Sequence, residues 1–200
     1  MSDLASLLAS RRMCRDFASA PLDHGVTTRL VDAASRAPSA GNTHGLEFLV
    51  LESPSTGDYW DVTLPPGRRE GFRWPGLLRA PLLLLPYVEP AAWALRYSEA
   101  DKAQSALGEV GSWPVPYWFV DGGAALMAVL LTAEDLGLGA LLFGQFRHEE
   151  ALKERFGVPA DRRALGTIAI GYRAAGEQSR STSARRGRQD PEDMIHRGGW

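Results

Sequence analysis

Three arginines fall close together near the start of the chain, at positions 11, 12 and 15. Cations placed so closely repel one another unless an anion lies among them. Because a guanidinium group can form two parallel hydrogen bonds to phosphate oxygens, the cluster is a candidate phosphate clamp. A solvated surface cluster explains these residues equally well when they are taken alone.

A loop of small residues between a predicted helix and a predicted strand is the second candidate site. The helix begins near Thr27 and is expected to end near Ala37, because Pro38 disfavours helix in the residue before it. An apolar run at 48–51 then predicts a buried strand. Small residues let a flat or anionic ligand approach the backbone, and the loop consists of Ser39, Ala40, Gly41, Asn42 and Thr43. An ordinary helix-to-strand connection is the alternative.

The sequence lacks the common motifs that place a catalytic group or a nucleotide. It has no GxGxxG fingerprint, no phosphate loop, no HExxH helix and no nucleophile elbow. Its four histidines are scattered without metal-ligand spacing, and only His44 falls in a candidate site. Anion clamps and small-residue loops without an obvious nucleophile or acid–base pair suit a protein whose cofactor carries the chemistry.

The composition is that of an ordinary soluble globular protein, with 44% hydrophobic and 23% charged residues. The net charge of −2 does not indicate nucleic-acid binding. The single cysteine, Cys14, allows no intrachain disulfide and fits a reducing compartment, so a cytoplasmic location is expected. The longest uncharged apolar stretch, 122–133, is too short to span a bilayer. We therefore expect neither a nucleic-acid partner nor a membrane.

The order of the predicted elements indicates an α+β fold around a mixed sheet. The apolar run at 80–86, bounded by prolines, predicts a central strand that is buried on both faces. Residues 59–64 could form another strand or part of a lid. A helix is expected from an N-cap at Asp121 to a C-terminal Gly137, and its apolar surface predicts burial in the core or at a subunit interface. The remaining predicted elements are helices at 4–10 and 149–156 and strands at 138–144 and 166–172.

Three motifs occur in a characteristic order. The run Arg11-Arg12-Met13-Cys14-Arg15-Asp16-Phe17 looks like Arg-Arg-Ser-x-Arg-x-Phe, and Ala37-Pro38-Ser39-Ala40-Gly41-Asn42-Thr43 looks like Ala-Pro-Ser-x-x-Asn-x. Arg186-Gly187-Arg188, which alone would indicate a flexible basic tail, is similar to a Lys/Arg-x-Arg motif near the end of the chain. In this order, over nearly the whole chain, the motifs resemble the FMN-dependent nitroreductase family.

The resemblance implies a nitroreductase-like α+β fold. In that fold a mixed central sheet is flanked by helices, a long central helix is buried, and two subunits intertwine as a homodimer with FMN at the interface. The match treats residues 1–200 as a single FMN-binding domain. Residues 59–79 and 89–118 would be variable excursions near the substrate channel, and residues 173–200 a C-terminal extension.

The resemblance also implies the residues of the cofactor site. The FMN phosphate and ribityl chain would be held by Arg11, Arg15, Arg186 and Arg188. Arg12 and Met13 would lie alongside, Met13 through its backbone. The other subunit would pack a loop on the flavin, made of Pro38, Ser39, Ala40, Gly41 and Asn42. Phe143 and Gly144 would lie beside the reactive flavin nitrogen, with the Gly144 amide as its donor, and no side chain need act as a catalyst.

The implied activity is transfer of electrons from NAD(P)H through FMN to a small-molecule acceptor. Nitroaromatics, quinones and enones are the expected acceptors, in a ping-pong cycle. The alternatives are a flavin-dependent dehydrogenase of a biosynthetic pathway, of the azoline-oxidase type, a non-catalytic FMN-binding or storage protein, and an α+β protein without flavin. The sequence departs from the family in three places: His44-Gly45-Leu46 replaces the frequent Gln-Pro-Trp, Met13 replaces Ser, and Phe143 replaces an acidic residue.

Overall fold

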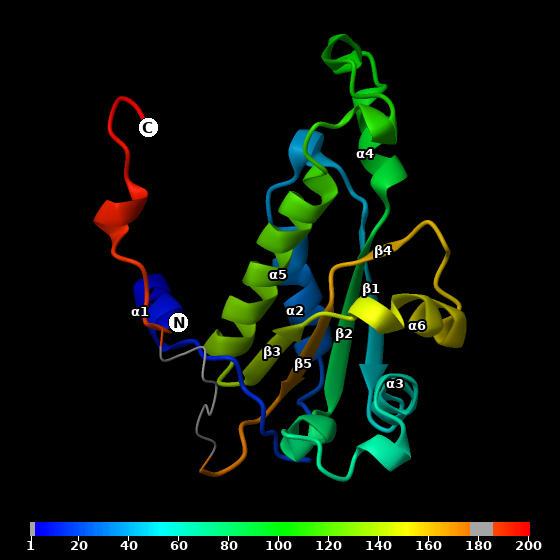
Figure 1. Ribbon diagram of the computed structural model, residues 1–200, viewed down its shortest axis with the longest axis vertical. Helices are drawn as coiled ribbons and strands as arrows, with labels where there is room; N and C mark the ends of the chain where they lie inside the picture. The colour runs from blue at the N-terminus through cyan, green and yellow to red at the C-terminus, as the bar shows by residue number, and fades with distance from the viewer. Residues whose placement is uncertain (1–2, 177–185) are drawn as a thin grey trace.

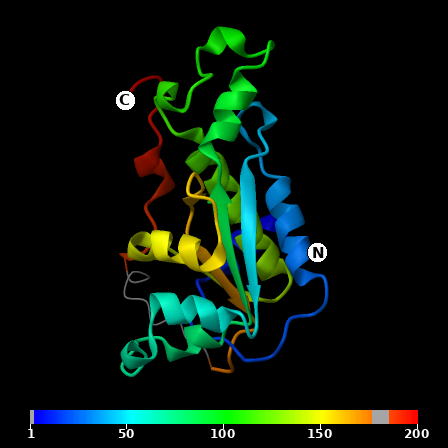
Figure 2. The same ribbon diagram turned by 90° about the vertical axis from the view of Figure 1, so that its right-hand side faces the viewer.

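The computed structural model describes residues 3–176 and 186–200, and its centre is a sheet with helices on both faces (Figure 1, Figure 2). The strands are β1 (Leu46–Glu52), β2 (Leu82–Val88), β3 (Gly139–Phe143), β4 (Arg163–Ala164) and β5 (Thr167–Gly171). The helices are α1 (Leu4–Ser10), α2 (Val26–Ser35), α3 (Thr56–Thr63), α4 (Pro90–Tyr97), α5 (Tyr117–Asp135) and α6 (Glu149–Phe156). This confirms the α+β class. None of the helices in the described part of the chain is long and apolar enough to cross a membrane.

The sheet is antiparallel rather than mixed. Its strand order is β1-β2-β5-β3, with β4 paired to β2, and each ladder between these strands is antiparallel. The end of β1 pairs with the start of β2, through Glu52 and Leu82, and the end of β3 pairs with the start of β5, through Phe143 and Thr167. The connection from β1 to β2 and the connection from β3 to β5 each begin and end at the same edge of the sheet. The strands that each connection joins therefore run antiparallel.

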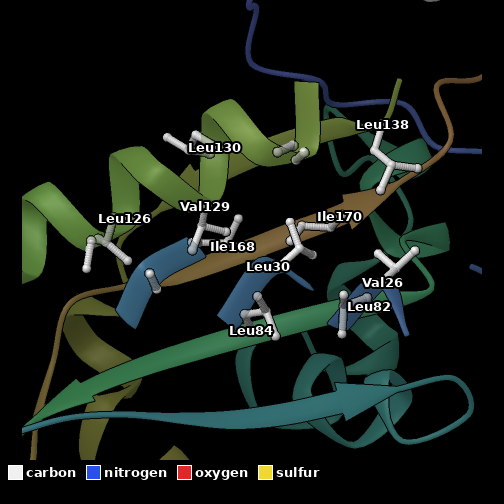
Figure 3. Close-up of a cluster of buried hydrophobic side chains, with 14 residues drawn as sticks. Val26, Leu30, Leu82, Leu84, Leu126, Val129, Leu130, Leu138, Ile168 and Ile170 are labelled. Carbon is white, nitrogen blue, oxygen red and sulfur yellow. The ribbon is translucent and has the colours of Figure 1, made fainter. Parts of the chain in front are cut away.

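Strand β2 lies inside the sheet, and all seven of its residues are buried, as its apolar sequence predicts. Successive side chains of a strand point to opposite faces. Leu84 accordingly packs against α2 and α5, together with Leu30 and Val129 (Figure 3). Leu83 belongs to a second cluster on the other face of the sheet. The strand thus joins two hydrophobic cores, one on each face.

Helix α3 covers the second core, and its position corrects a prediction. The sequence predicts a strand or part of a lid at residues 59–64, but the chain from Thr56 to Thr63 is helical. A short aromatic segment has no clear period, so strand and helix cannot be separated by sequence alone. Tyr59 and Trp60 are both buried in the second core, and tertiary packing thus decides the conformation.

Helix α5 begins earlier than predicted. Its first residue is Tyr117, directly after Pro116, so Asp121 lies inside the first turns and is not the N-cap. At the other end Gly137 has a φ of +70°, which confirms the predicted glycine terminus. Within one chain the helix buries one face against α2, while Val120, on another face, is 52% exposed.

Truncation of a buried side chain of β2 should destabilise the protein strongly. Leu84→Ala removes a fully buried side chain and is expected to lower the free energy of unfolding by about 3 kcal/mol. Leu95→Ala, on α4, is the matched control, because Leu95 is 72% exposed and the loss should stay below about 0.5 kcal/mol. Urea denaturation followed by circular dichroism measures both values, and equal losses would contradict the central place of β2.

Candidate functional site

A cavity of about 380 Å³, the aromatic cavity, lies between α3 and the end of β3. Its aromatic walls are Tyr59, Trp60, Phe72, Trp74 and Phe143. The rings of Trp60 and Phe143 are stacked, with centroids 6.1 Å apart and planes 7° from parallel. Three predicted site residues line this cavity: Arg15, Phe143 and Gly144. Apolar walls with a few polar groups are typical of a site for an organic ligand.

The segment that follows α1 brings Arg15 to the aromatic cavity. Met13 forms a bridge with Ala140 of β3, and the Cys14 N–H donates to the Ala140 carbonyl oxygen at 2.9 Å. The Arg15 guanidinium lies over the ring of Trp74, 5.5 Å from its centroid. A cation over an aromatic face is attracted by the ring quadrupole, which favours this position of the charge at the cavity wall.

The other two N-terminal arginines have different environments. Arg12 is exposed, and its Nη1 donates to the carbonyl oxygens of Ala9 at 2.6 Å and Arg11 at 2.9 Å, at the C-terminus of α1. The Nε of Arg11 is buried and has no hydrogen-bond partner among the described residues. A buried donor without a hydrogen-bond partner costs about 1–3 kcal/mol. Among the three N-terminal arginines, Arg11 would therefore gain most from a bound anion.

A second cavity of about 410 Å³, the loop cavity, lies between α2, β1 and α5. Its lining includes Pro38, Ser39 and Asn42 of the predicted loop. Gly41 and Asn42 have positive φ angles of 64° and 55°, a conformation that glycine adopts freely and asparagine tolerates. These left-handed residues turn the chain sharply between α2 and β1.

Asp121 fastens this loop to helix α5. Its Oδ2 accepts hydrogen bonds from the Ala40 N–H at 2.8 Å and from Trp93 Nε1 at 2.7 Å. From α4, the Nε of Arg96 donates to the Gly41 carbonyl oxygen at 2.8 Å. The sequence alone does not predict this role of Asp121. An acidic residue at the start of an otherwise apolar helix was the available signal, but it does not reveal a partner so far away in the chain.

The departure at 44–46 from the family motif also has a structural cause. A Cβ on Gly45 would lie 2.3 Å from the ring of Trp93, so only glycine fits beside this indole. His44 is exposed and lines the loop cavity. Trp93 therefore takes space that a larger residue at position 45 would need.

Two buried tyrosines lie behind the turn that follows β3. Burial raises the pKa of Tyr59 and of Tyr87 to about 12, so both phenols stay protonated at neutral pH and can donate hydrogen bonds. Tyr59 Oη lies 3.0 Å from Thr167 Oγ1, and Tyr87 Oη donates to Gln145 Oε1 at 3.4 Å. The sequence alone does not predict this group either, since these residues share no motif.

The predicted site residues therefore fall into separate groups. The aromatic cavity adjoins the core that packs under α3, and the loop cavity adjoins the core under α2 and α5, so the two cavities lie on opposite faces of the sheet. Arg186 and Arg188 belong to a C-terminal segment, 186–200, whose residues are all exposed and which extends away from the sheet (Figure 1). No group of three or more acidic, histidine or cysteine side chains within 3–176 and 186–200 could hold a metal ion.

Comparison with known proteins identifies the family. The model of the nitroreductase family matches residues 8–172. The chain belongs to the nitroreductase family. It is therefore an oxidoreductase, and the family match spans the N-terminal arginines, the loop and both cavities.

Three proteins similar to this nitroreductase-family chain share 25% sequence identity or less with it. A protein of Archaeoglobus fulgidus, provisionally assigned as an NADH dehydrogenase/NAD(P)H nitroreductase, is 25% identical over 175 residues, which are 86% of each chain. A nitroreductase family protein from Streptococcus pneumoniae superposes with a TM-score of 0.74 at 16% identity, over 97% of this chain and 99% of that one. An FMN-dependent nitroreductase from Clostridium difficile gives 0.66 at 18% identity, over 98% and 100%. Both structures share the fold.

Removal of the Asp121 carboxylate should loosen the loop. Asp121→Ala leaves the Ala40 N–H and the Trp93 indole N–H without their acceptor, and the free energy of unfolding should fall by about 1–3 kcal/mol. Asp121→Asn keeps an oxygen that can accept both bonds and should lose less. Urea denaturation measures both values, and an unchanged Asp121→Ala variant would contradict this role.

Proposed function

We propose that this nitroreductase-family protein is an FMN-dependent oxidoreductase that takes electrons from NAD(P)H, and that its flavin site forms between two copies of the chain. One observation carries the proposal: the residues expected to touch one flavin line two cavities on opposite faces of the same sheet. A ligand cannot reach both faces within one chain. It can do so when the loop of one copy faces the aromatic cavity of the other.

The exposed apolar surface supports association of two copies. On α5, Phe119 and Val120 are exposed. In the C-terminal segment 186–200, Ile195 and Trp200 are exposed as well, and none of the residues described there is buried. A second copy packed against α5 and against this segment would remove these apolar side chains from water, which favours association.

The charged groups fit an FMN phosphate. Arg11 has a buried Nε without a partner, which an anion would satisfy. The proposed contacts to the phosphate and ribityl chain come from Arg11, Arg15, Arg186 and Arg188. Arg12 and Met13 flank them, although Arg12 also caps α1. The loop of the second copy would contribute Pro38, Ser39, Ala40, Gly41 and Asn42.

The aromatic cavity fits a flat ring system. Phe143 lines the cavity with the buried Trp60 ring stacked on it, and Gly144 is exposed at the cavity wall, where its N–H would donate to a ring nitrogen. Bound FMN would supply the redox chemistry, which is hydride acceptance from NAD(P)H and electron transfer to an acceptor, for which we propose nitroaromatics, quinones or enones. The protein's part is to hold the ring and to exclude competing reactions, so no side chain is assigned as a catalyst. The names of the C. difficile and A. fulgidus relatives support this choice of cofactor and donor. A cytoplasmic location would supply the donor.

The visible absorption spectrum tests the proposal directly. The purified protein, with added FMN if necessary, should show protein-bound flavin whose absorption bleaches with NADH or NADPH under anaerobic conditions and returns with a quinone or a nitroaromatic. A protein that binds no FMN would overturn the proposal. Bound FMN that neither nucleotide reduces would instead favour FMN storage. A stable monomer with full FMN occupancy in sedimentation analysis would rule out a site shared by two copies.

Loss of the proposed phosphate ligands should weaken FMN binding. Arg11→Ala should raise the FMN dissociation constant by about 10- to 100-fold, because a charge-assisted hydrogen bond contributes about 1.5–3 kcal/mol. The double variant Arg186→Ala/Arg188→Ala should lose more, while the protein stays dimeric.

Arg36→Ala is the control for these variants, since Arg36 is exposed and pairs with Asp32 on α2. Fluorescence titration with FMN gives the dissociation constants. Unchanged FMN retention in the double variant would show that Arg186 and Arg188 do not bind the cofactor.

A further inference from the structure

The turn after β3 contains one buried residue between two exposed ones. Gly144 is exposed, and the side chain of Phe146 is 89% exposed, whereas Gln145 between them is only 4% exposed. Glutamine is rarely buried unless its amide is hydrogen-bonded. The side chain therefore acts as an anchor at the wall of the aromatic cavity, and its partners decide how firmly the turn is held.

The Gln145 amide is hydrogen-bonded at both of its polar atoms. Its Nε2 donates to the Gly166 carbonyl oxygen at 3.0 Å and to Thr167 Oγ1 at 3.2 Å. Its Oε1 accepts from Tyr87 Oη at 3.4 Å. Because the Gly166 carbonyl can only accept, the nitrogen of the amide must face it, which leaves one orientation for the side chain.

The network extends to helix α3 through Tyr59, whose hydroxyl lies 3.0 Å from Thr167 Oγ1. Tyr59, Tyr87 and Thr167 are all buried. Both phenols keep their protons at neutral pH, so each can donate. In a buried network an unmet polar group is costly, and the arrangement that satisfies every member is strongly preferred. The turn after β3 is thus tied to α3, β2 and β5 at once.

The backbone of the turn is strained next to this anchor. Phe146 has a φ of +35°, which is unusual for a bulky residue and persists only where the surroundings impose it. Its ring lies against Gly144, since a Cβ at that position would come within 2.4–2.8 Å of three ring atoms. The Gly144 backbone and the exposed Phe146 ring are therefore held in one mutual arrangement.

We propose that Gln145 is a positioning residue that fixes the Gly144 amide at the mouth of the aromatic cavity and so raises the preference of the site for oxidised over reduced flavin. The inference rests on the proposed function, in which the Gly144 N–H donates to the reactive flavin nitrogen. Oxidised flavin offers a lone pair there, whereas reduced flavin carries a proton. A hydrogen bond weakens steeply as its distance and angle depart from the ideal. Loss of the anchor should therefore weaken the binding of oxidised FMN more than that of reduced FMN.

The test uses two network variants of the full chain and one control. Gln145→Leu removes every bond of the anchor at similar volume, and Thr167→Val removes only the shared hydroxyl. Gln104→Leu makes the same chemical change as the first variant at an exposed position in the 3₁₀ helix 103–105. If Gln145→Leu does not fold, Thr167→Val carries the test.

Two readouts separate positioning from general stability. In the FMN-loaded protein, Gln145→Leu should lower the affinity for oxidised relative to reduced FMN about tenfold, which raises the two-electron midpoint potential by about 30 mV. In the flavin-free protein, the NMR order parameter of the Gly144 amide should fall from about 0.85 towards 0.6. Thr167→Val should shift both values in the same direction by less, and Gln104→Leu should match the wild type.

Folded network variants with wild-type potential and wild-type Gly144 order parameter would overturn the positioning role, even if the proposed function holds. A wild-type protein that binds no FMN would overturn the proposed function instead. In that case the flavin-free order parameters still decide whether Gln145 fixes the turn.

Discussion

The burial of β2 on both faces is the constraint on which the rest of the structure depends. All seven of its residues are buried, and their side chains alternate between the two faces, so the strand requires a cover on each side. Helices α2 and α5 form one cover, and α3 with its neighbours forms the other. Each cover leaves a cavity beside a loop. The division of the flavin site between two copies of the chain, as proposed, follows from this double burial.

Two polar side chains have the same physical role at these cavities. Asp121 ties the loop at Ala40 to α5, and Gln145 ties the turn at Gly144 to the core. Apolar packing alone has no direction and tolerates small shifts, whereas a hydrogen bond shielded from solvent fixes distance and orientation. Both segments of the site are thus held by side chains that are hydrogen-bonded to other parts of the protein.

The three N-terminal arginines belong to one sequence motif but have different environments in the folded chain. Arg12 donates to the carbonyl oxygens of Ala9 and Arg11 at the C-terminus of α1, and Arg15 lies over Trp74. Arg11 keeps a buried donor without a partner among the described residues. An anion would stabilise the environment of Arg11 most. It would give the buried Nε a hydrogen-bond partner, whereas at Arg12 it would replace an existing hydrogen bond.

The sequence alone determined the strongly patterned elements and the family. A strand buried on both faces has a continuous apolar run, Pro38 and Gly137 mark helix ends, and the ordered motifs indicate a nitroreductase, since each of these signals is local in the chain. Tertiary structure alone decided that residues 59–63 are helical, that Asp121 binds Ala40, 81 residues away, and that the two cavities lie on opposite faces. The physical reason is that local pattern encodes which side chains are buried, whereas their partners depend on contacts between distant segments.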